Sequence, residues 1–193
     1  QNRVGAHPFM LAAGDLNGDG APDAAVALEG AGQVAVLLND GRGGFAAPAL
    51  VDVGKSPAAV AIGDLNRDGA ADLATACWGS AEIVVNLGDG RGGFSAPRRI
   101  PADGRGQYGI AMADLDDDAA QDLVWTDIQR QAMVIRFGDG RGGFARGVEV
   151  STGAGVRDVA VADLNGDGHP DLAASNMADG SVSVALADGR GGF

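Results

Sequence analysis

The sequence predicts an all-β fold, a β-propeller made of four-stranded antiparallel blades, with four repeats of about 49 residues in this chain. Two motifs support this prediction, because each returns four times at one interval. The hexapeptide DGRGGF occurs four times, with its phenylalanine at Phe45, Phe94, Phe144 and Phe193. An acidic motif also occurs four times, closing at Asp23, Asp72, Asp122 and Asp171. Both sets are spaced by 49, 50 and 49 residues, as in repeated supersecondary units that pack against one another.

Within a repeat, short apolar runs follow one another in a constant order. In the second repeat they are 57–62, 73–77, 83–87 and the weaker 95–100; the acidic motif follows the first run and the hexapeptide the third. Runs of about five residues bounded by Gly and Asp are typical of strands, because helices need about ten to twelve residues. Four antiparallel strands make one blade. We therefore place blades at residues 5–53, 54–103, 104–152 and 153–193; the last stops before its fourth strand, part of which residues 1–4 could supply.

The glycine-rich hexapeptide is expected to be a hairpin. Two copies, read with the preceding glycine, spell the G-x-G-x-x-G of a dinucleotide-binding loop, but that loop occurs once in a fold, between a strand and a helix. Four copies at the blade interval instead predict the turn between the third and fourth strands, where Asp-Gly supplies positive φ. We expect its phenylalanine to pack between neighbouring blades.

Composition excludes several classes of partner. The chain has 26 acidic and 14 basic residues and a net charge of −12, so we expect no nucleic acid and no anionic membrane as partner. No apolar run approaches the roughly 18 residues of a membrane span, so we expect no membrane insertion. Cys77 is the single cysteine, and its apolar neighbours indicate a buried, unreactive thiol. The sequence begins at Gln1 without a signal-like stretch, as in a processed mature chain or an excised piece.

The acidic motif, D-x-[DN]-x-D-x-x-x-D, predicts a metal site between the first and second strands of each repeat. Five oxygens from nine residues suit Ca²⁺, which takes six to eight hard oxygen ligands, and we expect about one ion per repeat, up to four. Without metal, the carboxylates of a loop would repel one another. With the backbone carbonyl at position seven included, the candidate ligands are Asp15, Asn17, Asp19, Ala21 and Asp23; Asp64, Asn66, Asp68, Ala70 and Asp72; Asp114, Asp116, Asp118, Ala120 and Asp122; and Asp163, Asn165, Asp167, His169 and Asp171.

An EF-hand and a set of acidic turns without metal are the two other interpretations of these loops. An EF-hand needs Glu at position twelve and flanking helices, whereas position twelve here is Val26, Thr75, Trp125 or Ala174. Position six is glycine in three repeats, but Ala119 in the third should strain a positive-φ turn. Asp116, Asp117 and Asp118 add charge to that loop, and we still expect it to bind metal. The remaining alternative is four acidic turns without metal.

These residues carry a resemblance to a known family. The D-x-N-x-D-G-x-x-D loop, the strand that follows it and the hairpin together resemble the FG-GAP/VCBS repeats, the blades of integrin α-subunit propellers and of many secreted proteins. The likeness covers essentially the whole chain. It implies Ca²⁺ in the loop between strands one and two, an extracellular or cell-surface location, and a role in adhesion, in sugar binding, or as a scaffold within a polysaccharide lyase.

The chain departs from that family in its number of repeats. Such propellers usually have seven or eight blades, and this chain has four. Either the four close on themselves, or two chains combine as a homo-oligomer of eight blades, or the chain is a fragment of a longer protein. The sequence leaves these alternatives open.

Recognition is expected on the end of the blades opposite the metal loops, because the sequence varies most there. We expect a glycan or a protein as the ligand. The candidate contacts are Trp78, Tyr108, Arg130, Arg157 and Asn176, although packing between blades is the preferred interpretation for Trp78 and Tyr108. The chain shows no G-x-S-x-G motif and only two histidines, so we find no catalytic constellation and expect a binding module or a purely structural unit rather than an enzyme.

Overall fold

Fifteen strands and no helix make up the described part of the chain, residues 2–102 and 104–193 of a computed structural model. The strands form four antiparallel sheets, one for each sequence repeat, which confirms the predicted all-β fold of blade-like sheets. The chain divides into two compact units, Gln1–Asp64 with Asp68–Asp103, and Leu65–Arg67 with Gly104–Phe193. No helix in the described residues could span a membrane.

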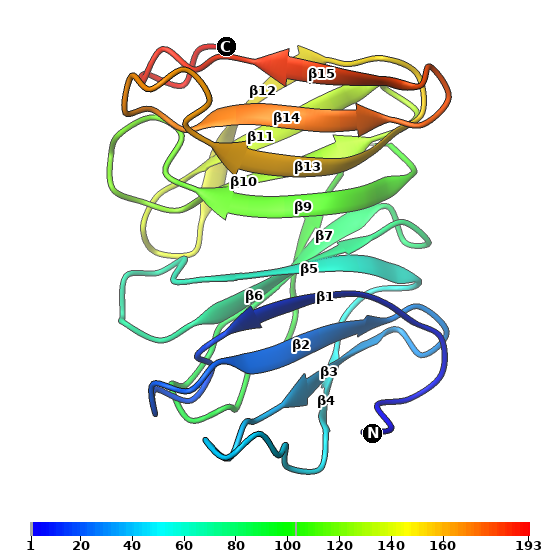
Figure 1. Ribbon diagram of the computed structural model, residues 1–193, viewed down its shortest axis with the longest axis vertical. Coiled ribbons are helices and arrows are strands. Elements are labelled where there is room, and N and C mark those ends of the chain that lie inside the picture. The colour runs from blue at the N-terminus through cyan, green and yellow to red at the C-terminus, as the bar shows by residue number, and fades with distance from the viewer. Residues whose placement is uncertain (1, 103) are drawn as a thin grey trace. The chain divides into compact units, whose positions relative to one another are not determined.

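The first unit holds two four-stranded sheets, ordered β1-β2-β3-β4 and β5-β6-β7-β8 (Figure 1). Their strands are β1 (Pro8–Gly14), β2 (Asp23–Leu28), β3 (Gln33–Leu37), β4 (Ala49–Asp52), β5 (Pro57–Gly63), β6 (Asp72–Cys77), β7 (Glu82–Asn86) and β8 (Arg98–Pro101). The two sheets share one apolar core. Val34 and Val36 of the first sheet lie in it together with Val60 and Val84 of the second.

The second unit is built in the same way, but its last sheet has three strands in the described residues. One sheet is ordered β9-β10-β11-β12 and the other β13-β14-β15. The strands are β9 (Gln107–Ala113), β10 (Asp122–Asp127), β11 (Ala132–Gly138), β12 (Phe144–Ser151), β13 (Val156–Ala162), β14 (Asp171–Asn176) and β15 (Ser181–Ala185). Ile135 and Val159 meet in their common core. At the other end of the chain, Val4 packs against a cluster of the first sheet that contains Leu28 and Leu37.

The hexapeptide forms the predicted hairpin between the third and fourth strands of the first three sheets, and the same turn follows β15 in the fourth sheet. Its first glycine has positive φ in every copy: Gly41, Gly90, Gly140 and Gly189 lie between 63° and 69°. The aspartate before it accepts the N–H groups two and four residues later, as Asp40 does from Arg42 at 2.8 Å and from Gly44 at 2.9 Å.

The expectation for the hexapeptide phenylalanine holds only in part. Phe94 and Phe193 pack against the cores of their units. Phe45 is 36% exposed, so its ring is not buried between sheets. In the second repeat, Gly92 of the hexapeptide lies close to the first repeat. Its N–H donates to the Leu16 carbonyl at 3.1 Å, and a Cβ on Gly92 would lie only 2.9 Å from Leu38 Cδ1.

Candidate functional site

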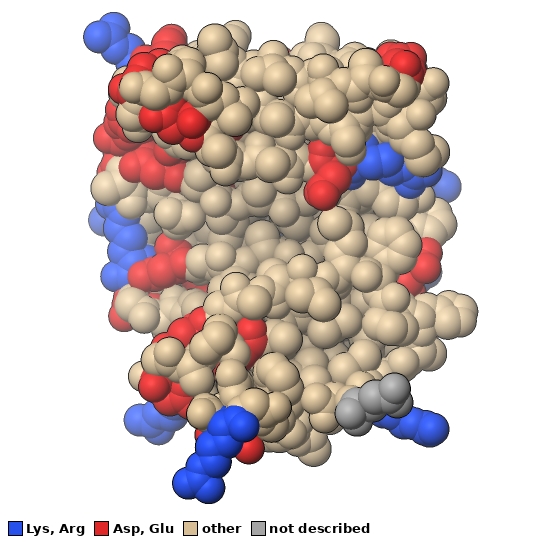
Figure 2. All heavy atoms as spheres, viewed as in Figure 1, with Lys and Arg blue, Asp and Glu red and all other residues tan. Residues whose placement is uncertain are grey.

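The acidic loops and the hexapeptide hairpins lie at the same end of each sheet. The loop joins the first strand to the second, the hairpin follows the third, and the strands alternate in direction, so both turns fall at one end. Within each unit, Figure 2 shows acidic side chains gathered at the end of the sheets that carries these loops.

The first aspartate of the motif fixes the shape of the loop by accepting backbone N–H groups. Asp15 Oδ1 accepts from Gly18 at 2.7 Å, and its Oδ2 accepts from Gly20 at 2.8 Å. The N–H of Gly20, followed by that of Gly18, lowers the pKa of Asp15 below its usual 3.8, although burial opposes the shift. The Oδ2 atoms of Asp64, Asp114 and Asp163 accept the corresponding N–H at 2.8 to 2.9 Å.

Position six has a left-handed backbone in all four loops. The φ angles are 84° at Gly20, 85° at Gly69 and 93° at Gly168, and Ala119 takes 67° in the third loop. The predicted strained alanine is therefore confirmed. A left-handed residue with a Cβ costs roughly 1–2 kcal/mol relative to its usual conformation.

The aspartate at position nine is buried, and both of its oxygens accept backbone N–H groups. Asp23 is 1% exposed; its Oδ2 accepts from Leu16 at 2.9 Å and its Oδ1 from Asn39, at the end of the third strand, at 2.7 Å. Asp122 and Asp171 make the same two bonds. Sequence reasoning treated this residue only as a metal ligand and missed its structural role, which its place at the start of a buried strand could have indicated.

The third loop brings three carboxylates together. Ligand atoms of Asp114, Asp116 and Asp122 all lie within 4.8 Å of one another. Burial raises the pKa of Asp122 to about 6; the N–H groups of Gly138 and Leu115 oppose this shift, and the charges of Asp116 and Asp118 add to it. Convergent carboxylates of this kind fit a hard cation such as Ca²⁺.

The middle positions of the loops are tied by local hydrogen bonds. Asn17 Oδ1 accepts the Asp19 N–H at 3.0 Å, and Asp19 Oδ1 accepts the Ala21 N–H at 2.8 Å. The same bonds recur among Asn165, Asp167 and His169, and from the Ala70 and Ala120 N–H groups to Asp68 and Asp118. In the second loop, Asn66 belongs to the second unit, whereas Asp64 and Asp68 belong to the first.

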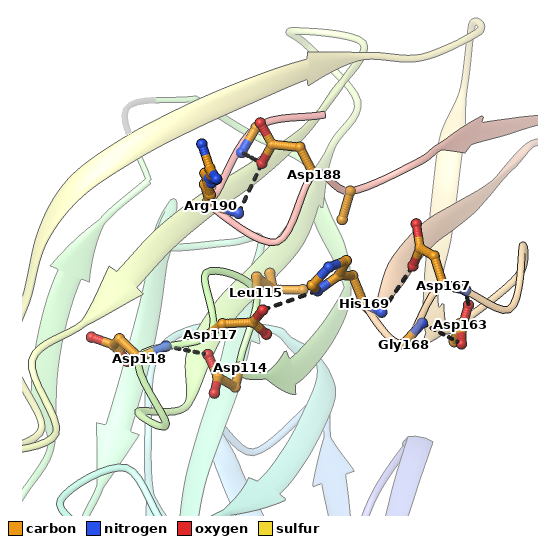
Figure 3. Close-up of polar contacts among 12 residues, drawn as sticks. Asp114, Leu115, Asp117, Asp118, Asp163, Asp167, Gly168, His169, Asp188 and Arg190 are labelled. Atoms are coloured by element: carbon orange, nitrogen blue, oxygen red, sulfur yellow. Dashed lines mark hydrogen bonds and ion pairs between the residues drawn. The ribbon is translucent and has the colours of Figure 1, made fainter.

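Position four makes contacts in the second unit that the sequence did not predict. Asp117 Oδ2 lies 3.0 Å from His169 Nδ1, so a side chain of the third loop meets one of the fourth (Figure 3). Arg67, also at position four, donates to the carbonyl groups of Asp118 at 2.7 Å and Ala119 at 3.2 Å. Neither contact could be inferred from one repeat, because position four varies among Gly18, Arg67, Asp117 and Gly166.

The predicted recognition residues are only partly brought together. The Arg157 guanidinium stacks 4.1 Å from the ring centroid of the half-buried Tyr108. The Arg130 Nε atom lies 3.7 Å from Oδ2 of the buried Asp127, and the Arg130 guanidinium also contacts the Glu149 carboxylate. Trp78 is half-buried in the turn after β6.

The prediction that Asn176 is a surface contact is wrong. It is only 2% exposed, and its Nδ2 donates to the Oγ atoms of Ser181 at 3.1 Å and Ser183 at 2.9 Å. The side chain is therefore used inside the fourth sheet. Cys77 is also buried, as predicted, and burial raises the pKa of its thiol to about 12.

The fold and the loops together define a class of repeat protein in which each antiparallel sheet carries one acidic loop. A family model described as "FG-GAP-like repeat" matches the chain three times, at residues 15–75, 64–125 and 114–174. The chain belongs to this FG-GAP-like repeat family. A comparison with curated proteins found no match.

Solved structures similar to the chain support the fold. A lectin of Agrocybe aegerita, described as recognising non-reducing terminal N-acetylglucosamine, is 23% identical with a TM-score of 0.65, and the match covers 94% of this chain and 49% of the lectin. The Photorhabdus luminescens Tc holotoxin pore is 24% identical (TM-score 0.53; 94% and 9% covered). BBS1N, solved in complex with ARL6DN, is 14% identical (TM-score 0.57; 97% and 59% covered). The chain thus spans about half the length of the lectin.

Proposed function

We propose that the chain is a calcium-stabilised, extracellular or cell-surface binding module, in which the acidic loops hold Ca²⁺ and the opposite ends of the sheets bind a glycan or a protein. The observation that carries the calcium proposal is the convergence of Asp114, Asp116 and Asp122 within 4.8 Å. The backbone carbonyl of Ala120 and the carboxylate of Asp118 would complete an oxygen set of the kind that Ca²⁺ takes.

The hydrogen bonding of the loops supports this proposal. Each carboxylate oxygen has two lone pairs, so an oxygen that accepts one N–H keeps capacity for a cation. The loop is therefore preorganised by its own backbone, which lowers the entropic cost of binding. Four Ca²⁺ ions would reduce the net charge from −12 to −4.

Calcium sites of low affinity would be consistent with the proposed extracellular location. Calcium-binding modules outside the cell work with dissociation constants of about 10⁻⁴–10⁻³ M, because the ion is abundant there. An affinity in that range would leave the loops empty in the cytosol and filled outside the cell.

Calorimetric titration of the calcium-free chain tests the metal sites. We expect Asp116→Ala to remove one site or weaken it by at least about tenfold, because a carboxylate ligand is lost. Asp116→Asn is the matched control and should keep the site, since the other three repeats have Asn17, Asn66 and Asn165 at this position. No heat of binding, together with the same melting temperature in calcium and in chelator, would overturn the calcium proposal.

The recognition proposal rests on the Tyr108–Arg157 stack, since an aromatic ring beside a guanidinium can stack on a sugar and hydrogen-bond to it. The lectin similarity makes terminal N-acetylglucosamine a natural probe. On a glycan array that includes it, we expect Tyr108→Ala to lose the signal of the chain and Tyr108→Phe, which keeps the ring, to retain most of it. A signal that is equal in the two variants would exclude this stack as the binding site.

A further inference from the structure

One face of the fourth sheet is apolar and exposed. We call it the outer face of the fourth sheet, and it consists of Ala160, Ala173, Val182 and Val184 with the flanking Leu164 and Leu186. Val182 is 66% exposed and Val184 57%; Leu164 and Leu186 are 50% and 51% exposed. An open hollow of about 240 Å³ lies here, lined by Ala160, Ala173 and Val182 together with Val159, Ala174 and the polar Asp158 and Ser175. Contiguous apolar surface of this kind marks an interaction site.

The same positions are buried in other repeats. In the third repeat, Met133 and Ile135 pair with Thr126 and Val124, as Val182 and Val184 pair with Ser175 and Ala173 in the fourth. Met133 and Ile135 are fully buried in the core between the two sheets of their unit.

The first repeat gives the same result independently. Val34, which pairs with Ala27, is fully buried, and Val36, which pairs with Ala25, is 1% exposed. Both lie in the core between the first and second sheets. The outer face of the fourth sheet thus corresponds in register to the faces of the first and third sheets that pack against a neighbouring sheet.

A complementary surface exists on the first sheet. A row of apolar side chains crosses its four strands through the cross-strand pairs Leu11↔Val26, Val26↔Ala35 and Ala35↔Leu50. We call these four residues the first-sheet row; Leu11 is 66% exposed and Leu50 55%, whereas Val26 and Ala35 between them are 9% and 0% exposed.

The register of the second sheet shows what the first-sheet row would contact. The matching row there contains Val60 and Val84, which pack in the core against the first sheet. In the fourth sheet, Val159 of the matching row packs in the core of the second unit. The first sheet therefore presents Leu11 and Leu50 to solvent in a row that other sheets use for packing, while Val26 and Ala35 lie in a buried cluster against which Val4 packs.

We propose that a second copy of this chain docks its first-sheet row onto the outer face of the fourth sheet. The projecting leucines of the row match a face whose alanines leave a hollow, and the contact would continue the sheet-on-sheet packing present within each unit. The two surfaces differ, so the interface is heterologous; copies then join head to tail and form a closed ring where the rotation permits.

Sedimentation velocity over a concentration series, with excess calcium for every sample, tests this proposal. We expect the chain of 19.2 kDa to form dimers or larger assemblies as its concentration rises. Leu11→Glu and Val184→Glu should each weaken association by roughly 100-fold, because a charge would be buried in an apolar contact. Met177→Glu is the control: Met177 is 66% exposed and lies in the turn after β14, outside both surfaces.

A mixture of the two variants decides the geometry. Leu11→Glu keeps an intact fourth sheet and Val184→Glu an intact first-sheet row, so the mixture should regain a one-to-one complex that neither variant forms alone. Circular dichroism should show both variants folded, because both positions are exposed in the single chain. A wild-type monomer at all concentrations, association that persists in either variant alone, or a mixture that stays monomeric would each overturn the proposal.

Discussion

Ala119 carries the only side chain at position six of the four acidic loops, and its backbone is left-handed with φ of 67°. Glycine takes this conformation without a steric penalty. We therefore expect Ala119→Gly to raise the free energy of unfolding by about 0.5–1 kcal/mol, after the larger entropy of glycine in the unfolded chain is allowed for. Urea unfolding monitored by circular dichroism measures the change.

The reverse substitution is the matched control. A Cβ on Gly168, in the fourth loop of the same unit, would meet no atom within 4 Å, so Gly168→Ala adds only backbone strain. It should lower the free energy of unfolding by a similar amount. A neutral or destabilising Ala119→Gly would show that the alanine is not strained in solution.

The hexapeptide aspartates Asp40, Asp89 and Asp188 have pKa values below the usual 3.8, because backbone N–H groups of the hairpin bind the charged form. Their stabilising contribution is fully present above the unfolded pKa and is lost as the pH falls through the lower folded value. Carbon-13 NMR should show these carboxyl groups titrating below their midpoints in the urea-unfolded chain. Equal midpoints in the two states would contradict this assignment.

For single residues, the sequence predicted which residue types stand at which positions, but it did not predict contacts between repeats. Ala119 stood out against three glycines at one position, so its strain could be predicted. The contacts of Arg67 and Asp117 could not, because they depend on where a neighbouring loop lies. The burial of Asn176 was missed because its position at the end of a strand looked like a surface turn.

The position-nine aspartate joins the acidic loop to the end of the third strand, because it accepts a backbone N–H from each, as Asp23 does from Leu16 and Asn39. In chelator, we expect Asp23→Asn to lower the free energy of unfolding by about 2–3 kcal/mol, because one of two buried N–H groups loses a charged acceptor. Asp19→Asn, at an exposed position of the same loop, should cost less than about 1 kcal/mol in chelator while still weakening calcium binding. Thermal unfolding with and without calcium separates the two effects. Equal losses in chelator would contradict the structural role of Asp23.

Strands and hairpins were predictable because their signals are local. Short apolar runs, Asp-Gly turns and a constant interval fixed the order of strands within each sheet. The exposure of Phe45 was not predictable, since the same hexapeptide leaves its ring exposed in one repeat and packed in others. Local sequence determines the turn, whereas burial of the ring depends on what lies beside it.

For the whole molecule, the charge predicts how salt acts. The net charge of −12 is concentrated in the acidic loops, so the calcium-free chain repels itself. Raising the salt concentration in chelator should increase the melting temperature by about 2–4 °C for each kcal/mol of repulsion that is screened. In calcium the increase should be clearly smaller. A salt effect of equal size in both conditions would count against neutralisation of the loops by the ion.

The two hydrogen bonds of the position-nine aspartate differ in the length of chain that they close. The Leu16 N–H is seven residues from Asp23, whereas the Asn39 N–H is sixteen residues away. Short loops close with a smaller loss of entropy and form sooner than long ones. We therefore expect the acidic turn to form first during folding and its carboxylate then to capture the end of the third strand, so each repeat carries its own starting point for assembly of its sheet.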